Sequence, residues 1–588
     1  MSKVNFDLPE EKKIFWHTSS HILAQAVKKL YPDAKLAIGP AIDNGFYYDF
    51  DVEKPFSPED LEAIEQEMSK IIKEDFKLKR FVLPREEAIK LMQEKGEPYK
   101  VELIEELADG EEISFYEQGG FTDLCAGPHL ESTGAIKAFK LITATGAYWK
   151  GSEKNKMLTR IYGISYPNKT ALDEYLVLLE EAKKRDHNKL GRELEYFTTV
   201  DYIGQGLPIM MPKGAKVLQI LQRFVEDEEE KRGYVLTKTP FMAKNDLYRV
   251  SGHWDHYRDK MFILGDENDE EVLALRPMTC PFQFQVYLSK MRSYRDLPMR
   301  FNETAYLFRN EASGEMHGLI RMRQFTLSEG HIACRADQLE EEFAGCLDLA
   351  KFMLTTLGLD GEVTYRFSKW DENNKEKYIG SADEWERIQN QMRVILNDLQ
   401  IDYYEADGEA AFYGPKLDVQ IKNVHGKEDT LITLQIDFQL ASRFGMEYVD
   451  SDGSKKNPYV IHRSSIGCYE RTLALLIEKY AGAFPAWLAP TQIKILPIGF
   501  NHHDFAYDLK KKMSDLGMRV EVDDRNEKIG YKIREAQTDK VPYMLIIGDK
   551  EIGSNTVSVR SRKKGELGAV AVDDFIKDVL DEINTKAI

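Results

Sequence analysis

Hydrophobic residues recur along the chain at helical spacing in some segments and at strand-like spacing in others. Residues 17–31, HTSSHILAQAVKKLY, have the spacing of an amphipathic helix, whereas the short runs 45–50, 146–151 and 157–163 are rich in aromatic and β-branched residues. Helices mixed with short strands are typical of an α+β domain. We therefore predict an N-terminal α+β domain over residues 1–168.

The rest of the chain divides by the same criterion into a connector and two further domains. Residues 169–194 combine apolar residues at helical spacing with dense charge, which predicts a helical linker. Over residues 195–487, runs rich in β-branched and aromatic residues alternate with helices, and this predicts a large, mainly antiparallel sheet. Residues 488–588 show β-α-β-like alternation, which predicts a separate small α/β domain. The fold class expected is α+β multidomain.

Composition excludes several classes of protein. A chain of 588 residues is too long for one core, and 43% hydrophobic with 30% charged residues is typical of folded rather than disordered chains. The five cysteines are widely spaced, which argues against a secreted disulfide framework. The chain start lacks the apolar core of a signal peptide, and no apolar run approaches about 18 residues. We expect a cytoplasmic protein with no membrane contact.

Net charge is −19, which argues against indiscriminate binding of polyanions. A nucleic-acid partner would need local basic surface. Residues 559–568, VRSRKKGELG, supply one candidate, with Arg560, Arg562, Lys563 and Lys564. A solvated hairpin is the other interpretation of this segment, and the pattern alone does not separate the two.

The densest group of charged candidates lies within residues 301–334. Arg309, Glu311, Arg321 and Arg323 occupy alternating positions, as on a half-buried strand. Buried guanidinium groups need anionic partners, and a triphosphate is one because guanidinium binds phosphate oxygens in pairs. Internal Arg–Glu pairing is the alternative. No GxxxxGK[ST] loop occurs in the sequence, so a P-loop cannot hold the phosphates.

Three segments together resemble one family. Residues 308–326, FRNEASGEMHGLIRMRQFT, are similar to motif 2 of the class II aminoacyl-tRNA synthetases, residues 233–242 to motif 1 and residues 466–478 to motif 3. Within that class the chain resembles the threonyl-tRNA synthetases over nearly its whole length. The resemblance implies an antiparallel-sheet catalytic core, an N-terminal editing domain and a C-terminal anticodon-binding domain. It also implies ligation of L-threonine to tRNA(Thr) through threonyl adenylate.

The resemblance assigns roles around ATP. Arg309 would hold the α-phosphate, Glu311 and Phe325 the adenine, and Arg471 the γ-phosphate, with Mg²⁺ bridging the phosphates. His253 would assist transfer to the ribose, or is a structural loop histidine. Pro240 in motif 1 would lie at a homodimer interface.

Cys280, His331 and His462 are far apart in sequence, although all three lie in strand-like or strand-end segments. One cysteine with two histidines leaves an open position on a tetrahedral zinc, as in substrate-binding sites. Such scattered residues seldom form a site. The resemblance nevertheless implies one Zn²⁺ per subunit here, contacting the amino and hydroxyl groups of threonine, with further pocket residues Tyr413, Gln435, Asp437 and Glu329.

A site that binds the threonine hydroxyl rejects valine, which lacks that group. It does not exclude serine, which lacks only a methyl group worth about 1–3 kcal/mol of binding. A second, hydrolytic site is therefore expected. His17 and His21 share a helix face, which fits a surface pair or a site. The resemblance groups them with other residues as an editing centre for Ser-tRNA. Water activation without metal is the favoured interpretation, and a four-ligand zinc site is the alternative. The remaining members of this centre are Cys125, His129, Asp123, Lys100 and Tyr48.

At the other end of the chain, Asn526, Glu551 and Arg560 match anticodon-reading positions of the family. Two departures stand out. Many bacterial members carry a ubiquitin-like domain before the editing domain, whereas WHTSSHIL begins here at residue 16, so we expect a form lacking that domain. Leu327 replaces an amide found in many bacterial relatives. A catalytically inactive, synthetase-like RNA-binding or regulatory protein, or an enzyme for serine or alanine, are the rival hypotheses.

Overall fold

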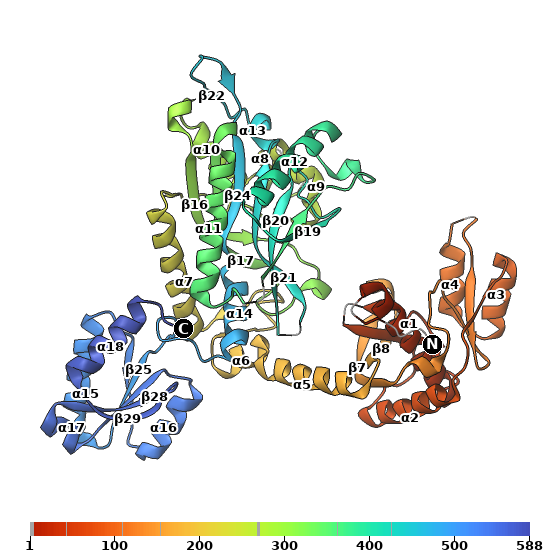
Figure 1. Ribbon diagram of the computed structural model, residues 1–588, viewed down its shortest axis with the longest axis horizontal. Helices are drawn as coiled ribbons and strands as arrows, with labels where there is room; N and C mark the ends of the chain where they lie inside the picture. Colours follow the sequence, from red (N-terminus) through yellow and green to blue (C-terminus); the bar gives the residue numbers. More distant parts are fainter. Residues whose placement is uncertain are drawn as a thin grey trace. The chain divides into compact units, whose positions relative to one another are not determined.

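The computed structural model describes residues 5–6, 8–42, 44–108, 110–152, 154–266, 271–361, 363–424 and 426–588. The chain forms two compact units, Met1–Glu181 and Ala182–Ile588, and Figure 1 shows the elements of each. No helix in these described ranges combines the length and apolar character required to cross a membrane.

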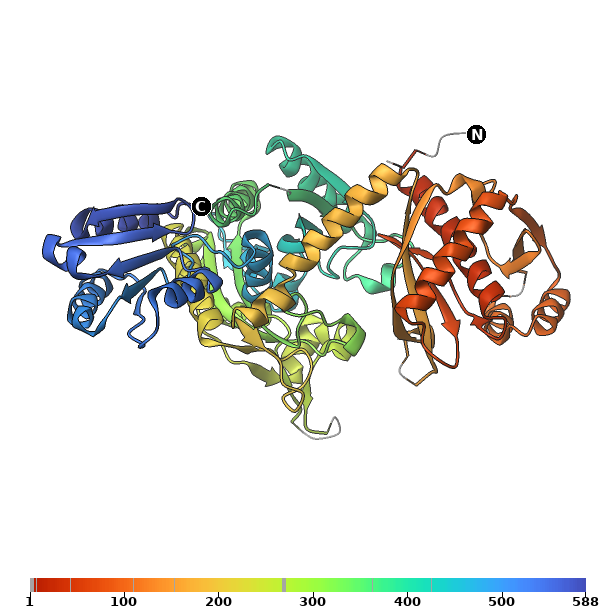
Figure 2. The ribbon, with the colours of Figure 1, turned by 90° about the horizontal axis from the view of Figure 1, so that it is seen from below.

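The first unit is built on a five-stranded antiparallel sheet of order β1-β3-β8-β7, with β2 paired to β3. Helices α1 (Pro9–Leu30) and α2 (Pro58–Glu74) pack against each other and against this sheet (Figures 1 and 2). Acidic residues begin α1 and lysines end it, which suits the helix dipole. The strands are β1 (Lys35–Leu36), β2 (Ala41–Ile42), β3 (Gly45–Asp51), β7 (Ala138–Tyr148) and β8 (Met157–Tyr166).

The same unit contains a smaller layer that carries the candidate residues Lys100 and Asp123. It consists of a three-stranded antiparallel sheet and two helices that pack together. Its elements are β4 (Lys79–Val82), β5 (Ser114–Gln118), β6 (Phe121–Leu124), α3 (Arg85–Glu94) and α4 (Pro98–Glu106). Helix α5 (Lys169–Arg185), the long helix of Figure 2, begins in the first unit and ends just after it, and α6 (His187–Glu193) follows. They occupy the segment for which a helical linker is expected.

The second unit contains an eight-stranded sheet of order β11-β16-β17-β24-β21-β20-β18-β19. Only the two outermost pairs are parallel, so the prediction of a mainly antiparallel sheet is confirmed. The strands are β11 (Val235–Leu236), β16 (Met299–Phe308), β17 (Gln324–Cys334), β18 (Val363–Ser368), β19 (Tyr403–Ala406), β20 (Lys416–Lys422), β21 (Glu428–Asp437) and β24 (Tyr459–Cys468).

One face of this sheet is covered by α11 (Leu339–Leu357), with α7 (Pro212–Lys231) and α14 (Tyr469–Tyr480) beside it (Figure 1). Ile332 of β17 and Ile461 of β24 belong to the large core on this side. Because side chains alternate along a strand, the neighbouring residues point to the opposite face. That face is therefore available for a site.

The C-terminal sheet has the order β26-β25-β27-β28-β29, the first three strands parallel and the last two antiparallel. Apolar residues are buried on both of its faces. The β-α-β prediction is confirmed. The elements are β25 (Ile493–Pro497), α15 (His503–Asp515), β26 (Val520–Val522), α16 (Ile529–Thr538), β27 (Tyr543–Ile547), α17 (Asp549–Ser554), β28 (Thr556–Ser561), β29 (Gly565–Ala571) and α18 (Val572–Asn584).

Candidate functional site

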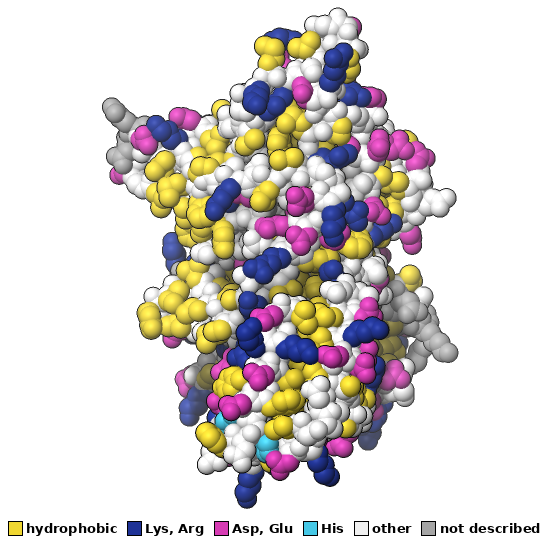
Figure 3. All heavy atoms as spheres, turned by 90° about the vertical axis from the view of Figure 1, so that its left-hand side faces the viewer, with side chains coloured by type: hydrophobic (Ala, Val, Ile, Leu, Met, Phe, Trp, Pro, Cys, Tyr) yellow, Lys and Arg dark blue, Asp and Glu magenta, His cyan; other side chains and the backbone are white. Residues whose placement is uncertain are grey.

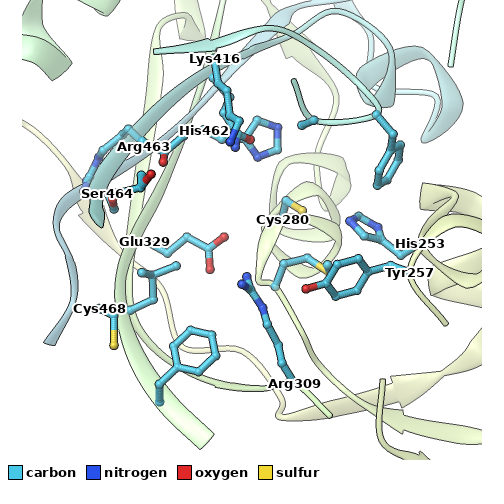
Figure 4. A pocket seen from close by; sticks show the side chains of 18 of the residues that line it. His253, Tyr257, Cys280, Arg309, Glu329, Lys416, His462, Arg463, Ser464 and Cys468 are labelled. Atoms are coloured by element: carbon cyan, nitrogen blue, oxygen red, sulfur yellow. The ribbon is translucent and has the colours of Figure 1, made fainter. Parts of the chain in front are cut away.

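A cavity of about 620 Å³ is lined by β17, β20, β21 and β24 together with the loops around residues 253–280 and 309–323. Figure 4 shows side chains from these separate segments pointing into the same space. The residues singled out from the sequence that line it are His253, Cys280, Arg309, Glu311, Arg321, Phe325, Leu327, Glu329, Tyr413, Gln435, His462 and Arg471. His331 and Asp437 lie next to it, in contact with the lining.

At one end of the cavity, Cys280, His331 and His462 are brought together with one donor atom each within 4.8 Å of the others. The sheet register explains the histidine pair, because His331 of β17 lies directly opposite His462 of β24. Cys280 was expected on a strand-like segment, and this was wrong. It begins helix α10 (Cys280–Leu288), whose proline at the second position suits a helix start.

Two further side chains fix the ring orientations of this trio. The carboxylate of Asp437 only accepts hydrogen bonds, so Nε2 of His462, 2.9 Å away, donates to it and Nδ1 keeps its lone pair. Nδ1 of His331 lies 2.5 Å from Oε1 of Gln283, whose amide nitrogen donates to Thr237. Oriented imidazoles of this kind are the usual environment of metal ligands.

The donor set fits a cation. Nε2 of His331 is buried and has no hydrogen-bond partner among the described residues, an arrangement that costs free energy unless a ligand supplies one. Burial, with the nearby carboxylates of Glu329 and Asp437, raises the pKa of the Cys280 thiol well above its ordinary value. A bound cation would offset the cost of the thiolate.

A second group of the same residue types shows the contrast. Asp186, His187 and Glu478 also cluster, but Nδ1 of His187 lies 2.7 Å from Glu478 and its Nε2 accepts from the backbone of Leu319. Both ring nitrogens are engaged by the protein. We therefore assign this group to packing of α6 on α14.

Arg309, Glu311, Arg321 and Arg323 do not lie on a strand, contrary to the expectation. β16 ends at Phe308 and β17 begins at Gln324, so all four belong to the connecting loop. The ladder stops there because Asn310 donates to Lys260 outside the sheet and a 3₁₀ turn follows. The alternating charges in this segment belong to a loop that contributes to the cavity lining, not to a pleated surface.

Two arginine side chains of the cavity are held by other residues that line it. The guanidinium of Arg309 lies 5.1 Å from the Phe325 ring centroid and points toward the cavity centre in Figure 4. Arg471 donates from Nε to the carbonyl of Ile320 and from Nη1 to that of Thr430. Neither bond neutralises the charge. Glu311 is paired with Arg321 at 3.0 Å. Among the residues that the structure describes, internal Arg–Glu pairing therefore occurs at Arg321 but not at Arg309 or Arg471.

Next to the Cys280 trio, Tyr413 donates to Oε1 of Gln435 at 2.6 Å and its ring lies beside that of His462. Nδ1 of His253 lies 2.7 Å from the hydroxyl of Ser251, and burial lowers the pKa of His253 to about 3. Burial also raises the pKa of Glu329. His253 is therefore neutral near pH 7.

Several residues that line the cavity or support it were missed from the sequence. Lys416 points into the cavity beside His462 in Figure 4. It follows Tyr413 by three residues in FYGPK, and this closeness to a predicted pocket residue could have identified it. Gln283 was detectable as the residue three positions after Cys280 on the same helix. Arg463, next to His462, is buried and paired with Glu229 at 2.5 Å, a partner that no local pattern indicates.

In the first unit, His17, His21, Cys125 and His129 form a third cluster with donor atoms within 4.8 Å of one another. The thiol sulfur of Cys125 lies 3.3 Å from Nε2 of His17 and 3.1 Å from Nε2 of His129. Burial lowers the pKa values of the three histidines and raises that of Cys125 to about 12. A neutral imidazole can accept a proton from a bound water, whereas the neutral thiol can only hydrogen-bond to that water.

A buried network supports this cluster. Asp123 accepts from the hydroxyl of Tyr48 at 2.5 Å and pairs with Lys100 at 2.8 Å. Oδ2, the oxygen that accepts from Tyr48, also lies 4.0 Å from Nε2 of His21. The seven N-terminal residues singled out from the sequence thus lie together.

The three C-terminal candidates are not all at one place. Asn526 follows β26 and Glu551 lies on α17 after β27, so both are at the carboxyl edge of the parallel strands. Arg560 is on β28 opposite Met544, nearer the other end of β27, and contacts Glu566.

On the molecular face of Figure 3, basic side chains are interspersed with acidic and hydrophobic ones, so basic surface is locally present despite the net negative charge.

Comparison with known proteins agrees with this geometry. Residues 113–162 match the threonyl and alanyl tRNA synthetase second additional domain, residues 257–480 the class II tRNA synthetase core domain and residues 492–582 an anticodon-binding domain.

Full-length relatives match as well. The chain is 64% identical to a threonine–tRNA ligase of Clostridium perfringens, covering 98% of this chain and 90% of that protein. It is 62% identical to one of Clostridium botulinum, covering 100% and 91%. Its structure resembles the RNA-binding domain of a Cryptosporidium parvum threonyl-tRNA synthetase, with TM-score 0.64, 30% identity, and 67% and 98% coverage.

Proposed function

The chain belongs to the threonyl-tRNA synthetase family, and from that premise we propose how its residues perform the reaction. The enzyme ligates L-threonine to tRNA with ATP, and it carries the editing domain of the family. The residue assignments rest on one observation: Arg309, Arg471 and the Cys280 trio surround the same cavity of about 620 Å³. Threonine-dependent ATP–pyrophosphate exchange, followed by charging of tRNA(Thr), tests it.

ATP is proposed to bind along the loop that precedes β17. By the family resemblance Arg309 would contact the α-phosphate and Arg471 the γ-phosphate. Both side chains line the cavity, and no carboxylate among the described residues pairs with either guanidinium group. Phe325 would stack on the adenine, and Glu311 would accept from its amino group. Mg²⁺ would accompany the phosphates. Fixed charges placed where the transition state gains negative charge lower the barrier to adenylate formation.

Threonine is proposed to bind at the opposite end. Cys280, His331 and His462 would hold one Zn²⁺, which when bound contacts the amino and hydroxyl groups of threonine as a Lewis acid. Asp437 and Gln283 keep the two imidazoles oriented. The Tyr413–Gln435 pair and Glu329 would line the amino-acid pocket. His253 would accept or pass the ribose proton during transfer.

A site that recognises threonine through its hydroxyl group also activates some serine, because serine has the same hydroxyl. We propose that the cluster of His17, His21, Cys125 and His129 orients a water for hydrolysis of Ser-tRNA(Thr), without metal. Asp123, held by Lys100 and Tyr48, would keep His21 in place. Asn526, Glu551 and Arg560 are proposed to contact the anticodon.

The editing assignment predicts a separation of activities. Cys125→Ala and His17→Ala should each slow hydrolysis of preformed Ser-tRNA(Thr) by about 10²-fold, because each removes a group that positions or activates the water. Threonine charging should stay within about twofold of the parent. Deacylation of Ser-tRNA(Thr) and charging are measured on the same preparations. Wild-type serine clearance in both variants would refute the assignment.

We propose a homodimer formed through motif 1. Val235 and Leu236 on the edge strand β11 are each 61% exposed, and Phe241, Met242 and Tyr306 beside them are also exposed. An apolar patch on a sheet edge is typical of an interface.

Free cysteines at five positions suit a cytoplasmic location.

Leu236→Asp should therefore produce monomers. An uncompensated charge buried at the interface costs about 3–5 kcal/mol, so the dimer should dissociate at low micromolar concentration. Light scattering coupled to size exclusion measures the mass. Val394→Asp, at an apolar position on α12 (Ala382–Asp398) that is 56% exposed, is the matched control and should leave the dimer intact. A wild-type monomer with full charging activity would contradict the proposal.

A further inference from the structure

The carboxyl edge of the C-terminal sheet presents an aromatic side chain that packing does not explain. Phe500, three residues after β25, is 84% exposed, and Ile498 beside it is 52% exposed. The Phe500 ring lies 5.2 Å from the His503 ring. Full burial of such a side chain would be worth about 1.5–3 kcal/mol, so this segment leaves that stabilisation unused.

Topology places Phe500 between two polar positions already singled out. β25 lies between β26 and β27, and all three strands are parallel, so their carboxyl ends meet at one edge. Asn526 lies in the loop after β26 and Glu551 on the helix after β27. Ile498 approaches Gly548 so closely that a Cβ there would lie 3.0 Å from its Cδ1.

Hydrogen bonds from a buried lysine and from Glu551 connect the strand ends at this edge. Lys532 of α16 is 2% exposed, and its ammonium donates to the carbonyls of Pro497 at 3.1 Å and Asp523 at 2.8 Å. This one cation therefore ties the end of β25 to the end of β26. Oε2 of Glu551 accepts from the backbone of Gly548 at 3.0 Å and fixes the third strand end. A preorganised surface loses little entropy when it binds a partner.

We propose that Phe500 is a stacking platform for an unpaired base of the tRNA anticodon loop, with Asn526 and Glu551 contacting base edges on either side. The proposal rests on the function proposed above and names a contact that the anticodon assignments do not include. Every base has a π face, so stacking on Phe500 would raise affinity without choosing the base.

Charging kinetics of Phe500 variants test this contact. Phe500→Ala should raise KM for tRNA(Thr) by about tenfold, because stacking on an aromatic ring is worth roughly 1–3 kcal/mol per base. Its kcat and its tRNA-free ATP–pyrophosphate exchange should stay unchanged. Phe500→Trp, which keeps an aromatic face, should restore KM to within about twofold.

Two controls make the result specific. Leu516→Ala, at a 50% exposed apolar position after α15 and so at the opposite edge of the sheet, should leave KM unchanged. A tRNA made abasic at each anticodon nucleotide in turn should include one whose loss is not additive with Phe500→Ala. A KM within twofold of wild type for Phe500→Ala, or additive losses at every anticodon position, would overturn the proposal. Absence of threonine-dependent exchange in the wild type would instead contradict the proposed function.

Discussion

Replacing Cys280 by alanine should leave the chain without stoichiometric zinc and lower threonine-dependent ATP–pyrophosphate exchange by more than about a hundredfold. Changes to outer-shell partners of metal ligands cost about 10- to 100-fold in affinity or activity, and loss of a ligand itself should cost more. In this variant the two other candidate ligands, His331 and His462, stay buried, and Nε2 of His331 has no hydrogen-bond partner among the described residues. Metal content by mass spectrometry and exchange rates are measured on one preparation.

Cys334→Ala is the matched control for this change. Cys334 is buried on β17, three residues after His331, and its thiol is not one of the three candidate ligands. This variant should keep both zinc and exchange, so a general disturbance of the strand would be recognised. Retention of one zinc per chain by Cys280→Ala, with exchange near the wild-type rate, would contradict the ligand assignment.

Arg309→Ala should reduce exchange by about 10²- to 10³-fold, the usual effect of removing one group that stabilises transition-state charge. The loss should fall mainly on kcat rather than on KM for ATP, because a phosphate contact that strengthens in the transition state affects kcat. Exchange kinetics at varied ATP concentration separate the two parameters. Zinc content should remain that of the wild type, which distinguishes this defect from the one at Cys280.

Arg387→Ala provides the comparison. Arg387 lies on α12, where it is exposed and contacts the hydroxyl of Tyr459 outside the cavity. Its removal should leave exchange within about twofold of the wild type. Equal losses in both arginine variants, or an Arg309→Ala enzyme with unchanged kcat, would argue against a role for Arg309 at the phosphates.

Local periodicity was sufficient for the fold class because it reports which face of each element is buried. The strands around 297–310 and 318–334 were recognisable from their β-branched and aromatic residues, and they pair as β16 and β17. The same criterion failed for Arg309 and Arg323. Alternation in a charged segment does not require a sheet, and the loop carrying them leaves the ladder through a backbone bond from Asn310 to Lys260.

Partners distant in sequence were beyond reach of pattern analysis. The bond between Asp437 and His462 joins residues 25 apart through the register of β21 and β24, and Gln283 reaches His331 over 48 residues. Residue types alone left the Cys280 trio as one possibility among many, and the family motifs selected it. Register and helix placement, which depend on the whole core, then determine whether the donor atoms converge.

Zinc per chain, measured together with amino-acid-dependent exchange on one wild-type preparation, tests the central claim most directly. One zinc per chain should accompany exchange that is fastest with threonine, roughly 10- to 200-fold weaker with serine and weakest with valine, since valine lacks the hydroxyl. A protein that activates threonine at full rate while holding no stoichiometric zinc would contradict the account, as would valine activated as well as serine.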